Sequence, residues 1–197
     1  MNGRSAVFLD RDGVLNALVP DPITGRPESP LRTQDVHLLR GVVEAIKALR
    51  SVGFVIACVS NQPAAAKGLV SEKDLREVHA VVLAELEEAG AKIDASRICL
   101  HHPDGRVPEL KGPCDCRKPA PGMLHSIATE MTIDLSRSWV VGDTDADLLA
   151  GRAAGCSTIL IEHPSSEHKR FGTTVPDGKA PDLLTAAAMI VGASKAR

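Results

Sequence analysis

The chain has 197 residues, of which 44% are apolar and 24% are charged, and its formal net charge is −2 at pH 7. This length and composition predict a single globular domain and exclude a disordered chain. The negative charge and the 2% content of aromatic residues argue against a nucleic-acid partner. No apolar run reaches the length of a membrane span and no secretory signal is recognisable, so we expect a cytoplasmic protein, a monomer rather than a dimer, with no membrane partner.

Strands and helices are predicted to alternate along the chain. Continuous apolar runs predict buried strands over residues 7–9, 54–59, 97–100, 139–141 and 157–161. Apolar residues at helical spacing predict helices over residues 41–50, 71–86, 122–131, 146–154 and 182–191. Proline-rich, glycine-rich or polar stretches predict loops over residues 17–32, 101–121 and 162–181. The alternation predicts an α/β fold with a parallel sheet between two helical layers, in a single domain over residues 1–197.

The first predicted strand ends in two carboxylates, Asp10 and Asp12, with Gly13 directly after them. In an open α/β sheet, ligands bind beyond the carboxyl ends of the strands. Two acidic groups in this place can hold a divalent cation and take part in chemistry beside it. The Asp-Gly pair is also common in simple turns, so this stretch alone leaves a turn as the alternative.

A third carboxylate, Asp143, follows the predicted strand over residues 139–141. Right-handed crossovers bring the carboxyl ends of parallel strands to one edge, so Asp10, Asp12 and Asp143 should converge there. Clustered carboxylates repel one another unless a cation joins them. Mg²⁺ fits because it takes oxygen ligands and commonly bridges carboxylates to a phosphate.

Groups that bind phosphate are predicted at the same edge. Ser60 ends the strand over residues 54–59 and offers a hydroxyl, while Arg117 and Lys118 offer positive charge. A metal, a nucleophilic carboxylate and cationic groups fit phosphoryl transfer, in which positioning and charge neutralisation provide most of the catalysis.

Four ordered motifs resemble those of the haloacid dehalogenase superfamily of hydrolases. They are Asp10-Arg11-Asp12-Gly13-Val14-Leu15-Asn16, Ser60-Asn61, Lys118, and Gly142-Asp143 followed by Asp147. Together with the Cys-Asp-Cys-Arg-Lys-Pro run over residues 114–119, they are similar to the D-glycero-D-manno-heptose 1,7-bisphosphate phosphatases and their relatives, the histidinol-phosphate phosphatases. The resemblance covers nearly the whole chain and implies a three-layer Rossmann-like fold without a large cap domain.

The resemblance also implies roles for single residues. Asp10 would be the nucleophile that forms an aspartyl-phosphate, and Asp12 the general acid and then the general base. Mg²⁺ would be held by the Asp10 carboxylate, the main-chain carbonyl of Asp12 and the Asp143 side chain. Ser60 and Lys118 would bind the transferred phosphoryl group. Asp147 is expected to support the site, with a helix-surface acid as the alternative.

Two closely spaced pairs of ligands, Cys99 with His101 and Cys114 with Cys116, suit a tetrahedral structural Zn²⁺. His102 is a rival to His101, which the family pattern favours. The metal would hold the predicted loop over residues 99–118, which leads to Lys118. Buried free thiols are the alternative for these cysteines, and are the expectation for Cys58 and Cys156.

The chain departs from the family pattern at two places. Thr144 follows Asp143 where these phosphatases commonly have a cation, and residues 63–68 replace a loop that contains Ser-Gly in many relatives. Without a cap, the 17–32 loop and the zinc loop should shape the entrance, with Arg117 and then Asn61 as candidate substrate contacts. The expected activity is removal of the 7-phosphate of a heptose 1,7-bisphosphate. The alternatives are a histidinol-phosphate or sugar-phosphate phosphatase and an inactive zinc-stabilised binding module.

Overall fold

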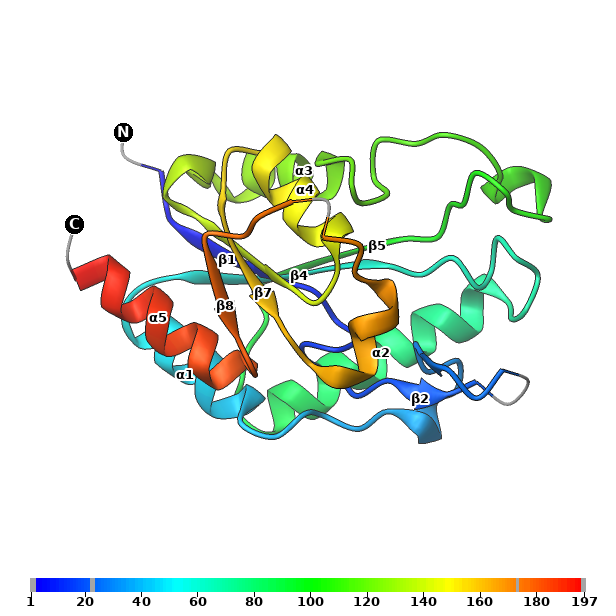
Figure 1. Cartoon of the computed structure of the whole chain (residues 1–197), viewed down its shortest axis with the longest axis horizontal. Helices are drawn as coiled ribbons and strands as arrows, with labels where there is room; N and C mark the ends of the chain where they lie inside the picture. The colour runs from blue at the N-terminus through cyan, green and yellow to red at the C-terminus, as the bar shows by residue number, and fades with distance from the viewer. Residues whose placement is uncertain (1–2, 22–23, 173, 196–197) are drawn as a thin grey trace.

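The computed structural model of the chain describes residues 3–21, 24–172 and 174–195. Within these residues, parallel strands form a six-stranded sheet in the spatial order β5-β4-β1-β6-β7-β8 (Figure 1). Their bounds are β1 Ala6–Leu9, β4 Val55–Asn61, β5 Ala95–Cys99, β6 Trp139–Gly142, β7 Ser157–Ile161 and β8 Gly178–Ala180. β1 pairs with β4 on one side and with β6 on the other, so the strand order reverses at β1. Open α/β sheets bind ligands at such a reversal.

Helices cover both faces of the sheet (Figure 1). Their bounds are α1 Val42–Ser51, α2 Glu72–Glu88, α3 Gly122–Met131, α4 Asp145–Ala153 and α5 Leu183–Lys195. Successive side chains of a strand point to opposite faces, and β1 shows the consequence. Val7 and Leu9 pack in the core formed with α1, α2 and α5, while Ala6 and Phe8 pack in the core formed with α3 and α4. A strand covered on both faces must be apolar throughout, which is why the short run of β1 contains no polar residue.

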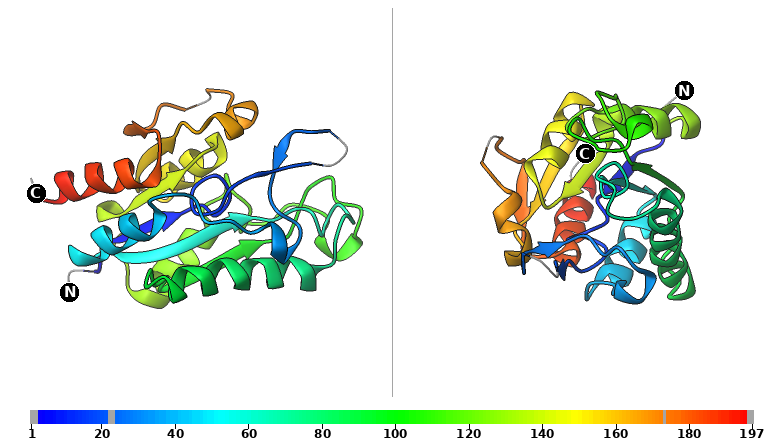
Figure 2. Two further views of the ribbon diagram at one scale, coloured as in Figure 1. Left: turned by 90° about the horizontal axis from the view of Figure 1, so that it is seen from below. Right: turned by 90° about the vertical axis from the view of Figure 1, so that its right-hand side faces the viewer.

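Two irregular segments extend beyond the end of the sheet where the strands finish. One carries the antiparallel pair β2 Val19–Pro20 and β3 Pro27–Glu28, and the other carries the 3-10 turn η2 Pro108–Leu110. Figure 2 shows both segments projecting at the same end of the molecule. A third apolar cluster, which includes Ala64, Ala66, Leu100 and Leu110, packs the segment after β4 against the segment that carries η2.

The predicted fold class is confirmed, and two predicted elements, α3 and β7, have the predicted bounds. The strand β8 was not predicted. Its three residues lie in the predicted loop over 162–181, where a mainly polar sequence gives no apolar run that would indicate a short edge strand. The predicted loop over 17–32 contains the β2–β3 hairpin, with residues 22 and 23 outside the described residues. In the described part of the chain, no helix combines the length and the apolar character that crossing a membrane requires.

Candidate active site

Asp10 lies directly after β1 at the centre of the sheet edge and is 8% exposed. Its Oδ1 accepts a hydrogen bond from Lys118 Nζ at 2.8 Å, and the same ammonium group also donates to the main-chain oxygen of Val59 at 2.8 Å and to Asp147 Oδ1. All three N–H groups of the buried Lys118 are therefore used. Burial raises the pKa of Asp10 to about 6, with Lys118 acting against the shift and Asp147 and Asp12 adding to it.

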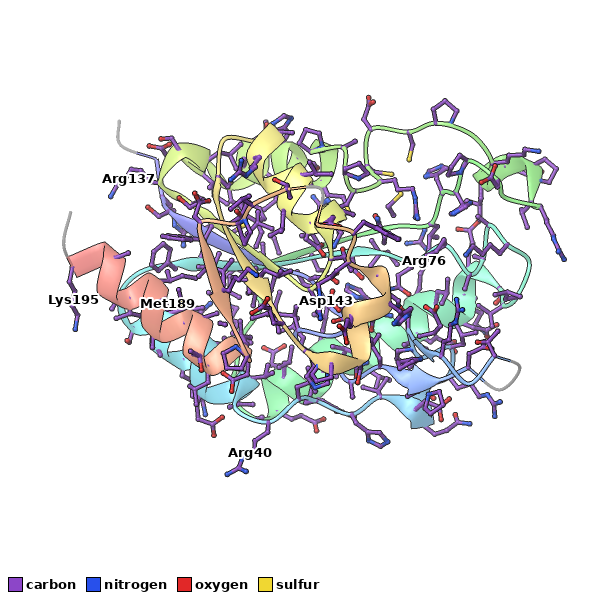
Figure 3. The ribbon with its side chains drawn as sticks, viewed as in Figure 1. Arg40, Arg76, Arg137, Asp143, Met189 and Lys195 are labelled. Carbon is purple, nitrogen blue, oxygen red and sulfur yellow. The ribbon has the colours of Figure 1, made fainter. Side chains whose placement is uncertain are left out.

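The carboxylate oxygens of Asp10, Asp143 and Asp147 lie within 4.8 Å of one another. Asp143 follows β6, is 1% exposed, and its Oδ1 has no hydrogen-bond partner among the described residues (Figure 3). Burial raises the pKa of Asp143 well above its ordinary range, and the neighbouring carboxylates of Asp10 and Asp147 raise it further. A buried carboxylate oxygen without a partner, beside two other carboxylates, is unfavourable unless a cation binds there.

The balance of charge supports a divalent cation. Four buried carboxylates belong to the site, and the two buried cations that face them are Arg11 and Lys118. Two negative charges remain, which one Mg²⁺ would neutralise with the oxygen ligands that it prefers. Gly13 leaves space for this ion beside Asp143. Its backbone has φ 86°, and a Cβ in its place would lie 2.1 Å from Asp143 Oδ2. These residues fit the expected Mg²⁺ ion.

Asp147 supports Lys118 and begins α4 at the same time. Its Oδ1 accepts from Lys118, while its Oδ2 accepts from the backbone N–H of Thr144 at 3.1 Å and from the Thr144 hydroxyl at 2.6 Å. Thr144 is thus the first residue of a capping box, the arrangement that satisfies unpaired N–H groups at a helix start. Asp147 is 1% exposed, so the alternative of a helix-surface acid is wrong.

The Asp12 carboxylate turns away from the three clustered acids and is held by several donors. Arg11 donates twice, from Nε to Oδ1 at 3.0 Å and from Nη2 to Oδ2 at 2.9 Å, and is itself fully buried. Gln62 Nε2 donates to Oδ2 at 2.7 Å, and Asn16 Nδ2 donates to Oδ1 at 3.3 Å. Although burial alone would raise the pKa of Asp12, Arg11 and the other donors hold it below the usual range. These donors favour the ionised form of Asp12.

The other predicted phosphate-site residues lie around the same edge. The Ser60 hydroxyl is 2% exposed and accepts from Gln62 Nε2 at 2.9 Å. Asn61 pairs with the backbone of Lys118, donating to its carbonyl at 2.9 Å and accepting from its N–H at 3.0 Å. Asn61 therefore fixes Lys118 and keeps one N–H of its amide for another acceptor. Arg117 Nη1 donates to the His101 carbonyl at 3.3 Å, which places its guanidinium beside the cysteine cluster.

Four predicted zinc ligands come together before Lys118. The distances between sulfur atoms are 2.9 Å for Cys99 and Cys116, 3.4 Å for Cys114 and Cys116, and 3.6 Å for Cys99 and Cys114. The His101 Nδ1 lies 3.5 Å from the Cys116 sulfur. Zn–S bonds of ~2.3 Å in a tetrahedral site place sulfur atoms roughly 3.8 Å apart, so this donor set fits Zn²⁺ with a small expansion.

Of the two candidate histidines, His101 belongs to this group of donors and His102 does not, because the Nδ1 of His102 accepts from the backbone N–H of Asp104. The remaining cysteines, Cys58 and Cys156, are buried free thiols, as predicted.

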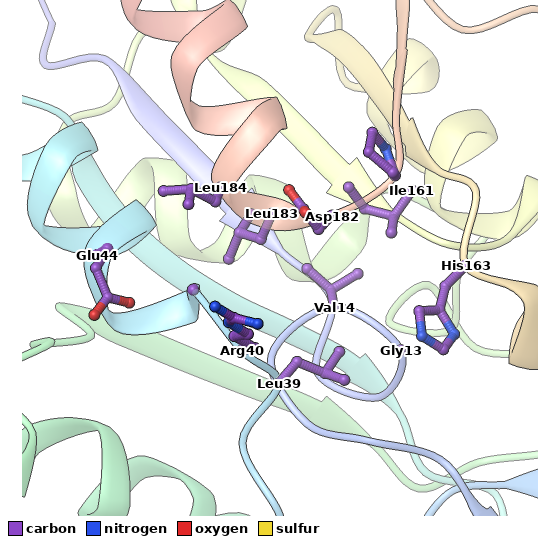
Figure 4. Close-up of a pocket in the computed structure, with 12 residues that line it drawn as sticks. Gly13, Val14, Leu39, Arg40, Glu44, Ile161, His163, Asp182, Leu183 and Leu184 are labelled. Carbon is purple, nitrogen blue, oxygen red and sulfur yellow. The ribbon is translucent and has the colours of Figure 1, made fainter.

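Two cavities flank the Asp10–Gly13 turn. The larger, of about 710 Å³, lies beside Gly13 and Val14. Its lining includes apolar Leu183 and the charged residues Arg40 and Asp182 (Figure 4). None of the predicted site residues lines it.

The second cavity, of about 590 Å³, lies between the β2–β3 hairpin and the segment after β4. Gln62 and Ser29 line it, and both make hydrogen bonds to Asp12. Two lining residues of this second cavity therefore contact Asp12, although Asp12 itself does not line it. The predicted loop over 17–32 shapes this cavity, whereas no described residue of the zinc loop lines it.

Some residues that bind Asp12, among them Arg11 and Gln62, were not predicted to be part of the site. Arg11 has no assigned role within the first motif, and Gln62 lies outside the four motifs. Their partner is Asp12, and no spacing rule connects a strand-end glutamine to a carboxylate 50 positions earlier. The pairing becomes visible only when β1 and β4 lie side by side.

Comparison with known proteins gives the family. The HAD-hydrolase-like family matches residues 115–186. A D-glycero-beta-D-manno-heptose-1,7-bisphosphate 7-phosphatase of Rhodopseudomonas palustris is 38% identical over 159 residues, which cover 81% of this chain and 84% of the relative. The chain belongs to the haloacid dehalogenase superfamily. Within it, the chain belongs to the family of the heptose-1,7-bisphosphate 7-phosphatases, because an alpha-anomer enzyme of Photorhabdus laumondii is also 35% identical over 84% of this chain and 88% of its own.

Solved structures agree with this haloacid dehalogenase assignment. The D,D-heptose 1,7-bisphosphate phosphatase of B. bronchiseptica, complexed with magnesium and phosphate, has a TM-score of 0.78 and 28% identity, and the match covers 96% of this chain and 99% of that one. A HAD-like phosphatase of Mesorhizobium loti has a TM-score of 0.77 and 27% identity over 96% of this chain and 88% of that one. The chain is therefore a phosphatase by family.

Proposed function

We propose that this haloacid dehalogenase phosphatase removes the 7-phosphate of D-glycero-D-manno-heptose 1,7-bisphosphate in a Mg²⁺-dependent reaction. The observation that carries the proposal is the contact between the buried Asp10 carboxylate and Lys118 at the point where the sheet order reverses, beside Asp143 and Asp147. The names of the relatives supply the substrate, and they include enzymes for both anomers, so the proposal covers both.

The first step is attack of an Asp10 carboxylate oxygen on the substrate phosphorus. The bond between phosphorus and the sugar oxygen breaks, and that oxygen takes a proton from Asp12. Asp12 must bind this proton before the step, because Arg11 and Gln62 favour its ionised form. Lys118 keeps its contact with Asp10 and offers positive charge to the transferred group, with the Ser60 hydroxyl as a further hydrogen-bond partner.

The second step is hydrolysis of the aspartyl-phosphate on Asp10. Water attacks the phosphorus, Asp12 takes the proton of that water, and the bond to Asp10 breaks to release phosphate. The metal would be held by Asp10, by the main-chain carbonyl of Asp12 and by Asp143. When bound there, the metal would neutralise charge on the phosphoryl oxygens.

We also propose that Cys99, His101, Cys114 and Cys116 hold one structural Zn²⁺. A closed set of four protein ligands leaves no open position for chemistry, so this metal organises the segment that ends in Arg117 and Lys118. The contact of Arg117 with the His101 carbonyl supports that function. It joins a guanidinium group that is a candidate for binding substrate directly to a residue that would bind the zinc.

Phosphate release from a panel of substrates tests the activity. The panel contains both heptose 1,7-bisphosphate anomers, histidinol phosphate and common sugar phosphates, each with and without Mg²⁺. We expect a heptose bisphosphate to give the highest kcat/KM and Asp10→Asn to abolish turnover while far-UV circular dichroism stays unchanged. Near-normal turnover by Asp10→Asn would sink the nucleophile assignment, and a preference for histidinol phosphate would sink the substrate assignment.

A further inference from the structure

The Gln62 side chain connects two functional groups of the site. It follows β4, is 1% exposed, and its Nε2 donates to Asp12 Oδ2 at 2.7 Å and to Ser60 Oγ at 2.9 Å. An amide nitrogen carries two hydrogens, so both are used. A carboxylate can only accept hydrogen bonds, which fixes the side of the amide that faces Asp12.

The backbone of Gln62 is also held firmly. Its N–H donates to the Cys99 carbonyl at 2.7 Å, and the preceding residue, Asn61, is paired with Cys99 in the sheet and with the backbone of Lys118. A buried side chain on a backbone fixed in this way has little freedom to change its direction. Gln62 can therefore fix the position of the carboxylate that it binds.

Arg11 and Gln62 restrain Asp12 from different directions. Arg11 binds both carboxylate oxygens from the neighbouring position in the chain, whereas Gln62 binds Oδ2 from the adjacent strand. Gln62 also lines the cavity between the hairpin and the segment after β4, together with Ser29. Gln62 and Ser29 thus connect Asp12 to the wall of this cavity, from which we infer that the leaving group approaches.

We propose that Gln62 is a positioning residue that holds the Asp12 carboxyl group toward the leaving oxygen of the substrate. This inference rests on the proposed function and assigns a residue to its proton-transfer step. Without Gln62, Asp12 keeps both Arg11 contacts but loses its link to Ser60, so its carboxyl group settles on Arg11 and reaches the leaving oxygen poorly.

The test compares two leaving groups. An alkyl phosphate releases an alkoxide that must be protonated, whereas p-nitrophenyl phosphate releases an anion that needs no proton. The measured quantity is kcat/KM, because it reports only the steps up to transfer of the phosphoryl group to Asp10. The variants are Gln62→Leu and Gln62→Met, which remove the donor and keep most of the volume.

General acid catalysis contributes typically ~10²–10⁴-fold, and partial misplacement of the acid should cost part of it. We expect Gln62→Leu to lose roughly tenfold to a hundredfold in kcat/KM for the alkyl phosphate and less than about threefold for p-nitrophenyl phosphate. Asp12→Asn should show the same selectivity with a larger loss. Val52→Ala, which changes a 39% exposed residue directly after α1 and outside the site, should leave both values unchanged.

Each outcome bears on the proposal. Equal losses for both substrates in folded Gln62→Leu and Gln62→Met would show that Gln62 acts on phosphate binding through Ser60, and would overturn the assignment. Full activity of both variants would overturn it as well. Turnover of the alkyl phosphate by the unmodified protein supports the phosphatase function whatever the variants do. Absence of turnover by the unmodified protein with Mg²⁺ would overturn both proposals.

Discussion

Each of the four carboxylates in the site has a different set of partners. Asp12 has the bidentate contact with Arg11, Asp147 shares its two oxygens between Lys118 and Thr144, and Asp10 has one contact with Lys118. Asp143 has an oxygen without a partner. The carboxylate that has an unpartnered oxygen is therefore the one that a metal would satisfy, while Asp147 uses both of its oxygens to hold Lys118 and Thr144.

Lys118→Met should leave two adjacent buried carboxylates without their shared cation. We expect the free energy of unfolding to fall by about 3–5 kcal/mol in the absence of metal, as when one partner of a buried ion pair is removed. Mg²⁺ should restore part of this loss because it would supply positive charge to Asp10. Urea unfolding with and without Mg²⁺ measures both effects. Lys111→Met, an exposed lysine of the same segment, is the matched control, and equal stability of the two variants would contradict this account.

His79 makes the stability depend on pH. It lies on the buried face of α2, 8% exposed, and neither ring nitrogen has a partner among the described residues. Burial, and then the charge of Arg11, lower the pKa of His79 from 6.5 to about 4. The folded protein therefore keeps His79 neutral while the unfolded chain binds a proton below pH 6.5. The stability from this residue is complete above that pH and is lost as the pH falls toward 4.

The loss at His79 should amount to at most about 3 kcal/mol between these two pH values. Folding also changes the pKa values of Asp12 and Asp10, lowering the first and raising the second. The informative quantity is therefore the difference in stability between His79→Leu and the unmodified protein. Urea unfolding at several pH values should give a flatter profile for His79→Leu. Parallel profiles would show that the pKa of His79 is the same in the folded and the unfolded protein.

At the scale of elements, the segment over residues 101–121 has little regular structure of its own. It contains the single turn η2 among its described residues, yet it delivers Arg117 and Lys118 to the site. Its contacts include the cysteine and histidine cluster and the backbone bonds from Arg106 and Val107 to the Ala66 carbonyl. Metal affinity should therefore contribute directly to the folding of this segment.

The double variant Cys114→Ser/Cys116→Ser should lose the zinc that we expect at about one ion per chain. Limited proteolysis should then cut within residues 101–117, and phosphatase activity should fall because Lys118 loses its support. Metal analysis by mass spectrometry and peptide mapping are the measurements. Cys156→Ser, a buried cysteine outside the cluster, should keep the zinc. Protein purified without chelator that contains no zinc would refute the site.

The elements that the sequence predicted well are those with strong local signals. The helix predicted from residue 71 begins there with a capping box of Ser71 and Asp74, and the continuous apolar runs of β1 and β7 lie within the sheet. The short edge strand β8 has no such signal, since it contains a lysine and depends on β7 for its hydrogen bonds. In the site, motif spacing located Asp10 and Lys118, whereas Gln62 depends on a contact between strands that are distant in sequence.

At the scale of the molecule, both ends of the described chain belong to one core. α5 packs against α1, and Ile190 lies in the same apolar cluster as Ile46 and Leu9. The short hairpin is tied to η4 Pro164–Lys169 by an ion pair between Glu28 and Lys169 at 2.8 Å. This arrangement is what the predicted single domain requires, and the domain assignment, like the expected monomer, stays a prediction that unfolding and sedimentation experiments can test.

Ile190→Ala should destabilise the whole domain and not only its last helix. The loss expected for truncating a fully buried isoleucine is about 2–5 kcal/mol. Trp139 in β6 reports on the sheet by fluorescence, while circular dichroism reports on the helices. Both signals should shift to the same lower urea midpoint. Leu184→Ala, at a position 44% exposed on the same helix, should change little. Separate midpoints for the two signals would show that α5 unfolds independently.

The two oxygens of Asp147 also limit how this protein can be altered by evolution or by engineering. One oxygen begins α4 and the other holds Lys118, so a single side chain serves both helix formation and the proposed catalytic site. Asparagine would keep one oxygen that can accept from either Lys118 or Thr144. Its NH₂ group would face the remaining donor, and two donors cannot form a hydrogen bond with each other. Position 147 can therefore change only together with Lys118 or with the start of α4, and a search for stabilising substitutions should leave all three fixed.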